Sequence, residues 1–273
     1  MSTPTNYKTA DWNAYELLAE TAPTSITWAS RGGDGSGKSH FACTAPTPIF
    51  VAGFDPYGMQ RVAREVRHGK EIRIGRYGFN CAEHGEARSA VSAAAEAIWN
   101  RFVADYRTAL KYMSGNGKAH RQRGTILWDR EDLAWELLRY ASFGGQKNDG
   151  SKTAALDYGD LNAEYVSLIQ EARAAGVNLG LLQGLTANWV AKFDPNKGKM
   201  VNYEIGTKPD GFKKLADHVD ITIDHRWDAE LKEYTVRFQK FPNKEQKDQE
   251  YPNVTFVDMA TFAYPDTTEE EWR

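Results

Sequence analysis

The stretch RGGDGSGKSH, residues 31–40, constrains the fold of this chain more than any other part of the sequence. Gly32, four further residues, and then Gly37, Lys38 and Ser39 fit the spacing of a phosphate-binding loop. Such a loop needs glycines so that successive backbone N–H groups can point inward at one anion. SITWAS before it predicts a strand, and SHFACTA after it can open a helix. A flexible Gly/Ser linker is the alternative interpretation.

Strands and helices are predicted to alternate along the first two-thirds of the chain. TPIFVAGFDPYG predicts a strand that ends at Asp55, and GTILWD predicts a buried strand that ends at Asp129. VNLGLLQGL predicts another buried strand, with Gln183 near its end. Three segments between these strands are typical of helices: residues 83–112, REDLAWELLRYAS and LNAEYVSLIQEARAAG. The alternation predicts an α/β fold with a mainly parallel sheet flanked by helices.

The remaining segments are predicted to add hairpins and loops to this sheet. Residues 143–160 have no apolar periodicity and are expected to form a mobile surface loop. Residues 186–211 are typical of a hairpin or long loop, and DITIDHRW with EYTVRFQKF predicts a C-terminal antiparallel hairpin. The tail PDTTEEEWR is acidic and is expected to be frayed. With 273 residues, of which 41% are hydrophobic, the chain suits one large domain with additions.

Composition and charge exclude several classes of protein. The formal net charge is −3, so contact with nucleic acid would have to come from local basic patches. Cys43 and Cys81 lie far apart without metal-ligand spacing, which argues against a zinc site and against a disulfide-rich secreted scaffold. The N-terminus lacks a signal-peptide pattern, and no stretch is long and apolar enough to span a bilayer. We therefore expect a soluble, cytoplasmic protein without membrane contact.

The predicted strand ends bring polar side chains to one edge of the sheet, where parallel sheets bind their ligands. A nucleoside triphosphatase needs a lysine on the β- and γ-phosphates, a hydroxyl on Mg²⁺ and a strand-end carboxylate that holds this metal through water. Lys38, Ser39 and Asp129 match these three roles, although Asp129 could instead cap the following helix. The expected cofactors are ATP and Mg²⁺, with the nucleotide bound by Gly32, Gly33, Asp34, Gly35, Ser36, Gly37, Lys38, Ser39 and His40.

Three carboxylates are candidates for positioning the attacking water: Asp55, Glu131 and Asp132. We prefer Asp55, because it ends the strand that follows the loop and its helix and can face the γ-phosphate. Its alternative role is structural, in the turn FDPYG. Gln183 is expected to sense the γ-phosphate by a hydrogen bond, or else to cap a backbone group.

These segments together resemble a known family. GGDGSGKS, IFVAGFD, TILWD, ALDYGDLNAEYVSLIQEARAAGVNLGLLQ and KPDGFKKLADHVDITIDHRW are similar to segments of the phage-encoded RecA-like ATPases of the Sak4 type, which are single-domain recombinases. The resemblance implies a RecA-like P-loop NTPase domain at residues 23–241. An N-terminal extension at residues 1–22 precedes this domain, and a C-terminal strand and acidic tail at residues 242–273 follow it.

The resemblance implies ATP hydrolysis coupled to single-stranded DNA binding and to annealing or strand exchange. It also implies self-association into rings or filaments, with a single-strand-binding protein as a further candidate partner. Asp55 matches the acid that activates water, and residues 143–156 and 186–208 match two DNA-facing loops. Many relatives have Glu where Asp55 stands, and His is frequent where Gln183 stands, so slow hydrolysis or an altered trigger is an open alternative.

Lysines in these two loops, with aromatic side chains to stack on bases, suit a single-strand groove. The candidates are Lys147, Lys152, Trp189, Lys192, Phe193, Lys197 and Lys199. Solvated lysines on an ordinary hairpin, with Trp189 packed in the core, are the alternative.

Two rival functions use the same phosphate-binding loop. One is an ATPase that acts on a protein partner in phage replication or packaging. The other is a nucleotide kinase, which needs a lid with closely spaced arginines. Residues 143–157 contain lysines but no arginine, which weighs against the kinase.

Overall fold

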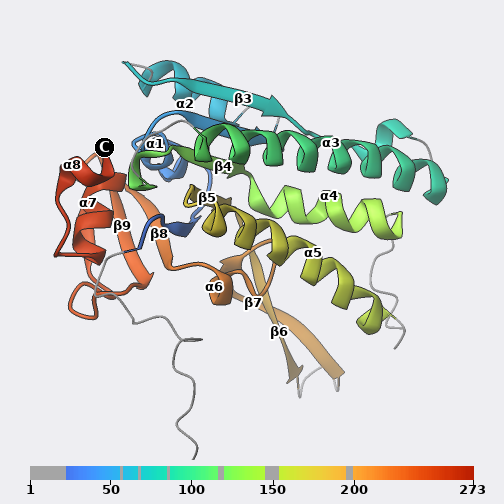
Figure 1. Ribbon diagram of the computed structural model, residues 1–273. Coiled ribbons are helices and arrows are strands. Elements are labelled where there is room, and N and C mark those ends of the chain that lie inside the picture. Colours follow the sequence, from blue (N-terminus) through green and yellow to red (C-terminus); the bar gives the residue numbers. More distant parts are fainter. Residues whose placement is uncertain are drawn as a thin grey trace, which may run out of the picture.

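A computed structural model describes residues 23–55, 58–66, 69–84, 87–115, 120–144, 154–194 and 199–273. An eight-stranded sheet forms its centre, and helices cover both faces of this sheet (Figure 1). The strands with parallel neighbours are β1 (Thr27–Arg31), β2 (Ile49–Gly53), β3 (Ile72–Arg76), β4 (Thr125–Asp129), β5 (Asn178–Gln183) and β8 (Ile221–Asp228). The predicted α/β class with a mainly parallel, helix-flanked sheet is confirmed.

The strand order is β10-β9-β8-β1-β5-β4-β2-β3. The strand β9 (Glu233–Lys240) pairs antiparallel with β8, which confirms the predicted C-terminal hairpin. The short strand β10 (Glu250–Pro252) pairs antiparallel with β9 at the edge of the sheet. In the parallel part, Arg31 is level with Gln183, and Gly53 is level with Asp129. This register places the ends of β1, β5, β4 and β2 along one edge of the sheet.

Aromatic side chains dominate the core between the sheet and the helices α3 (Arg88–Ser114), α4 (Glu131–Phe143) and α5 (Ala154–Ala174), which run side by side (Figure 1). Trp128, on β4, is fully buried among them. Its ring centroid lies 5.2 Å from that of Phe102 and 5.3 Å from that of Tyr165, both edge-on. Such contacts add to the free energy gained by burying the rings.

The opposite face of the sheet carries a second core. Its helices are α1 (Lys38–Ala42), α2 (Gly58–Val66), α7 (Phe256–Ala263) and α8 (Glu269–Trp272). Trp28, on β1, packs against Phe41 of α1 and Phe256 of α7, with centroid distances of 6.3 and 5.1 Å. The α1 helix and the sheet beneath it are thus fixed by residues more than 200 positions apart in the chain.

The prediction of a loop over residues 143–160 is wrong for its second half, because the helix α5 begins at Ala154. Tyr158 packs against Trp135 and Phe143 of α4, with centroid distances of 6.5 and 5.3 Å. These contacts between helices stabilise a turn that the local sequence does not favour. At its N-terminal end α3 begins at Arg88, after a short 3₁₀ helix at Cys81–His84, rather than at residue 83.

The expectation of a frayed tail is also wrong. Trp272 is fully buried, and its indole nitrogen donates a hydrogen bond of 2.8 Å to the hydroxyl of Thr267. Its ring lies next to those of Phe256 and Tyr264, and Glu271 pairs with Arg121. Burial of this tryptophan anchors an otherwise acidic segment.

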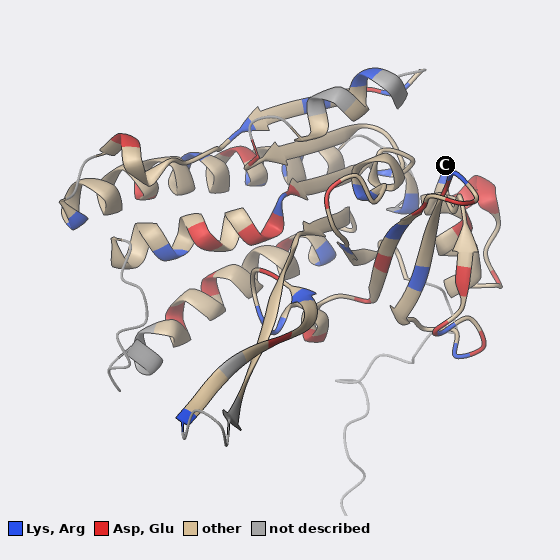
Figure 2. Ribbon diagram, turned by 180° about the vertical axis from the view of Figure 1, so that it is seen from behind, with Lys and Arg blue, Asp and Glu red and all other residues tan. Residues whose placement is uncertain are grey.

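The strands β6 (Leu185–Asp194) and β7 (Lys199–Pro209) form a separate antiparallel ribbon that projects away from the main sheet (Figure 1). The predicted hairpin in this region is confirmed. A short helix α6 (Leu215–His218) then leads into β8. Acidic and basic positions are interspersed along α4 and the β8–β9 hairpin in the view of Figure 2. None of the helices in the described part of the chain combines the length and apolar character needed to cross a bilayer.

Replacement of Trp128 tests the aromatic core. We expect Trp128→Ala to lower the free energy of unfolding by about 3–5 kcal/mol, because it leaves a large cavity among rings that cannot collapse into it. Trp189→Ala is the matched control: Trp189 is 56% exposed and its removal should change stability by about 0.5 kcal/mol or less. Urea unfolding followed by far-UV circular dichroism measures both. Equal losses in the two variants would contradict this assignment of the core.

Candidate functional site

Two close approaches define the shape of the loop at residues 32–37, which we call the glycine loop. A Cβ at Gly32 would lie 2.7 Å from the backbone oxygen of His225, and one at Gly37 would lie 2.5 Å from Cδ1 of Tyr234. Gly37 also has φ of +95°, in the region that side chains disfavour. A side chain at Gly32 would clash with the backbone of β8, and one at Gly37 would displace the ring of Tyr234. The predicted loop is therefore a tightly packed turn between β1 and α1, which argues against a flexible linker.

Lys38 lies inside the curve of the glycine loop and is only 8% exposed. Its Nζ donates hydrogen bonds of 2.7 Å to the carbonyl of Gly32 and 2.8 Å to that of Gly33. Burial lowers the pKa of this ammonium group, and the charge of Asp34 partly opposes that effect. A buried cation held only by two neutral carbonyls can exchange these contacts for stronger ones to an anion.

The helix that follows the glycine loop is short, with five residues from Lys38 to Ala42. A helix of this length adds little dipole of its own, so attraction for an anion must come mainly from Lys38 and the loop amides. Ser39 is half-buried in its first turn, whereas Asp34 and Gly35 are exposed. The ring of His40 is exposed and stacks on Tyr234.

Asp129 and Asp55 are brought together, as the sequence predicts. The backbone N–H of Asp55 donates to the carbonyl of Asp129 at 3.1 Å. A Cβ at Gly58, the first residue of α2, would lie 3.0 Å from Oδ2 of Asp129 and 3.5 Å from Oδ2 of Asp55. Both carboxylates therefore face the start of α2.

The environment of Asp129 is unusual for a carboxylate. It is 3% exposed, and its Oδ2 has no hydrogen-bond partner among the described residues. Burial raises its pKa to about 6, with a further contribution from the negative charge of Asp55. The positive charge of Lys38 acts in the opposite direction and lowers the pKa of Asp129. An unpartnered buried oxygen beside a second carboxylate is an arrangement that a divalent cation would stabilise.

The other two candidates for a water-positioning acid are held in structural contacts. Glu131 is fully buried, and burial raises its pKa to about 8. It accepts hydrogen bonds from the hydroxyl of Tyr165 at 2.7 Å and from the amide of Gln183 at 2.9 Å. Asp132, which is buried, forms an ion pair at 2.6 Å with the partly exposed Arg130. Asp55 is half-buried and lies beside Asp129 at the start of α2, so its position favours it among the three.

Gln183 lies at the end of β5, between the glycine loop and Asp129, where the sequence places it. Its amide nitrogen donates to Glu131 and, at 2.8 Å, to the carbonyl of Asp210, while its oxygen accepts from Arg31 at 3.2 Å. The capping alternative is thus observed, because one of its bonds goes to a backbone carbonyl. Sensing of a phosphate stays a prediction and would require these bonds to rearrange.

Sequence reasoning missed this buried cluster of Arg31, Glu131, Tyr165 and Gln183. No motif signals it, because its four members come from β1, α4, α5 and β5. The one usable signal is that Arg31 and Gln183 both lie at or next to the end of a predicted strand.

The predicted DNA contacts are only partly within the described residues. Lys147, Lys152 and Lys197 lie outside them. Lys192 and Phe193 are on β6, but only their backbone is described. Lys199 is exposed at the start of β7, and Trp189 is 56% exposed on β6, so Trp189 is not a core residue. No basic cluster from the first loop can therefore be placed next to the second.

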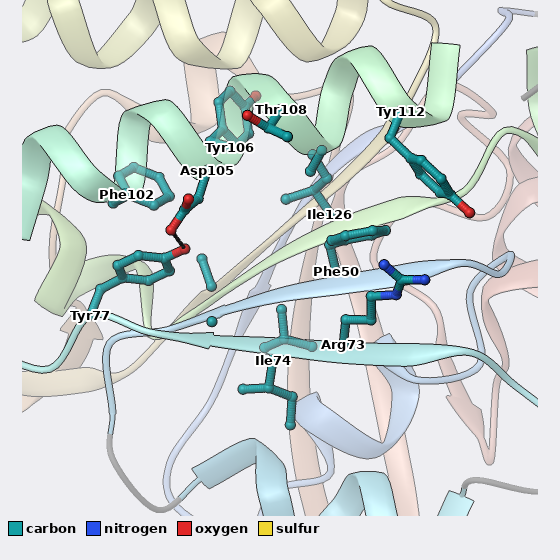
Figure 3. Close-up of a pocket in the computed structure, with 14 residues that line it drawn as sticks. Phe50, Arg73, Ile74, Tyr77, Phe102, Asp105, Tyr106, Thr108, Tyr112 and Ile126 are labelled. Atoms are coloured by element: carbon teal, nitrogen blue, oxygen red, sulfur yellow. Dashed lines mark hydrogen bonds between the residues drawn. The ribbon is translucent and has the colours of Figure 1, made fainter. Parts of the chain in front are cut away.

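A cavity of about 350 Å³ lies between β2, β3 and α3 (Figure 3). The guanidinium of Arg73 lies over the rings of Phe50 and Tyr112, 5.5 and 5.6 Å from their centroids. Tyr77 donates a hydrogen bond of 2.8 Å to Asp105 across it. None of the predicted site residues lines this cavity, so it is distinct from the glycine-loop site.

No protein-family model and no curated protein matches the chain. In the described residues, His, Cys, Asp and Glu do not form a group of three that could hold a metal by themselves.

The acid sensitivity of the fold should depend on His225. This imidazole is buried behind the glycine loop, 3.1 Å from the hydroxyl of Ser30, and burial lowers its pKa to about 3. Because its pKa is about 6.5 in the unfolded chain, the folded state loses stability as pH falls below 6.5, by about 1.4 kcal/mol per unit. Between pH 7.5 and 5.0 the wild type should lose about 2 kcal/mol more than His225→Gln.

Urea unfolding of both proteins at the two pH values measures this difference. Glutamine can still form a hydrogen bond with Ser30 but cannot be protonated. The two proteins therefore differ in pH dependence only by the titration of His225. Stability curves that stay parallel from pH 7.5 to 5.0 would contradict a buried neutral imidazole.

Proposed function

We propose that this protein is a P-loop ATPase with a RecA-like core that hydrolyses ATP to ADP and phosphate. One observation carries the proposal: the buried ammonium of Lys38 is held inside the glycine loop, close to the strand-end carboxylates Asp129 and Asp55. The strand order supports it, since β5 separates the loop strand β1 from the acid strand β4 and leaves room between their ends.

Ser39 and Asp129 are the residues that would hold Mg²⁺. The fit rests on the buried, unpartnered Oδ2 of Asp129, since Mg²⁺ is commonly bound by one or two protein oxygens together with water and phosphates. The ion would neutralise charge on the phosphate oxygens.

Each remaining side chain has a specific role in the hydrolysis step. Lys38 exchanges the carbonyls of Gly32 and Gly33 for oxygens of the β- and γ-phosphates and stabilises their negative charge. Asp55 accepts a proton from the water molecule whose oxygen attacks the γ-phosphorus. The bond between this phosphorus and the β,γ-bridging oxygen breaks, and ADP leaves with that electron pair.

The proposed binding partner is single-stranded DNA, which would lie along the β6–β7 ribbon. Tyr203 presents an exposed ring and Lys199 an exposed cation on one face of the ribbon, and Trp189 presents an exposed ring on the other face, where it is paired with Glu204. Rings for stacking and cations for phosphates are the combination that binds single strands without reading their sequence. Annealing or strand exchange on self-assembled rings or filaments is the corresponding process.

A specific observation favours a second candidate, an ATPase that acts on a protein partner. Leu185, Met200 and Ile205 are 39–59% exposed on the same ribbon. An exposed apolar surface of this kind is typical of protein contacts.

The test is ATP hydrolysis with and without an unstructured single-stranded oligonucleotide. We expect Lys38→Ala to reduce kcat at least about 100-fold, because it removes the main charge that stabilises the transferred phosphoryl group. Single-stranded DNA should stimulate the wild type, and Trp189→Ala should respond less. Tyr112→Ala, which removes a comparably exposed aromatic on α3, is the matched control and should respond as the wild type does.

Hydrolysis that depends on Lys38 but ignores DNA would favour the protein-coupled ATPase. Hydrolysis unchanged in Lys38→Ala would contradict the proposed site altogether.

A further inference from the structure

The two ends of a bound nucleotide must leave the glycine loop in different directions. In the proposed function the γ-phosphate end lies toward Asp129, at the end of β4, and Asp55, which follows β2. In the sheet these strands lie on one side of β1, and β8 and β9 lie on the other. The nucleoside end therefore points toward the β8–β9 hairpin.

A row of aromatic rings lies on that side of the loop. The rings of His40 and Tyr234 are stacked, with centroids 5.9 Å apart and an angle of 24° between their planes. Trp227, opposite Tyr234 on β8, continues the row at 4.8 Å. His40 and Trp227 are exposed and Tyr234 is half-buried, so this row is open to solvent at the mouth of the loop.

Tyr234 is held against the loop itself. Its ring occupies the space that a side chain at Gly37 would need, directly before Lys38. His40 follows Ser39 in the first turn of α1. A cavity of about 70 Å³ lies beside these two rings, with Asn253 and Thr255 in its wall.

We infer that the stacked rings of His40 and Tyr234 form the surface on which the base of the bound nucleoside triphosphate rests. Stacking between a base and an aromatic ring needs only an accessible π-face, and a row of rings at the correct end of the loop provides one. The inference rests on the proposed function, because it assumes that Lys38 binds the phosphates. It assigns base binding to the C-terminal hairpin, more than 190 residues from the loop.

Comparison of two ligands separates the base from the phosphates. Isothermal titration calorimetry with ATPγS and with inorganic triphosphate, each with Mg²⁺, measures affinity with and without a base. Tyr234→Ala should weaken ATPγS binding about tenfold, the effect of losing one base–ring stack, and leave triphosphate binding unchanged. Tyr234→Phe should bind both ligands as the wild type does, because the ring remains.

His40→Ala is a second variant that keeps the packing of Gly37, since His40 is exposed. It should weaken ATPγS binding and spare triphosphate binding, as Tyr234→Ala does. Tyr112→Ala, an exposed tyrosine on α3, should change neither affinity.

Three results would overturn the inference. If Tyr234→Ala and His40→Ala lower the affinities for ATPγS and triphosphate equally, the rings only shape the loop. If Lys38→Ala abolishes binding of both ligands while neither ring variant affects ATPγS, the phosphate site stands and the base lies elsewhere. If Lys38→Ala changes neither affinity, the proposed function fails and the base surface fails with it.

Discussion

Parallel pairing of β1 with β5, of β5 with β4 and of β4 with β2 is the constraint on which the rest of the structure depends. In-register pairing brings Arg31 level with Gln183, and Asp129 level with both Leu182 and Gly53. Each strand therefore ends at the same height, and whatever follows it is delivered to one edge. The glycine loop, the carboxylates and Gln183 meet there because of backbone pairing rather than because of any attraction between them.

The buried cluster around Glu131 fastens this edge to the β6–β7 ribbon. Gln183 bonds both Glu131 and the carbonyl of Asp210, and the N–H of Gly184 donates to Asp132 at 3.2 Å. One end of the ribbon is thus held by Asp132, and the other end is held by Gln183, which is itself bonded to Glu131. A fully bonded polar network inside a protein is stiff, because an unpaired buried group would cost free energy. The proposed ATP site and the proposed partner surface therefore share one rigid support.

Much of the fold could be predicted from the sequence. TILWD and NLGLLQ are continuous apolar runs, which buried parallel strands require, and the glycine loop has a distinctive spacing. Errors occurred where long-range packing overrides local preference. The segment 143–160 as a whole is rich in Gly, Lys, Asn and Asp, which predicts a loop, yet Tyr158 packs against Trp135 and Phe143 and residues 154–160 are helical. The acidic tail has the composition of a frayed end, yet Trp272 fills a space in the core.

The sequence by itself determined the glycine loop, the identity of Lys38, the strand end at Asp129 and, to within two residues, the strand end before Asp55, because local spacing and apolar runs encode these directly. Only the tertiary structure decided which carboxylates are engaged elsewhere, how buried Asp129 is, and that Tyr234 lies against Gly37. These properties depend on distances between segments that are remote in the chain. No local pattern records such distances, because they arise when two layers of helices close over the sheet.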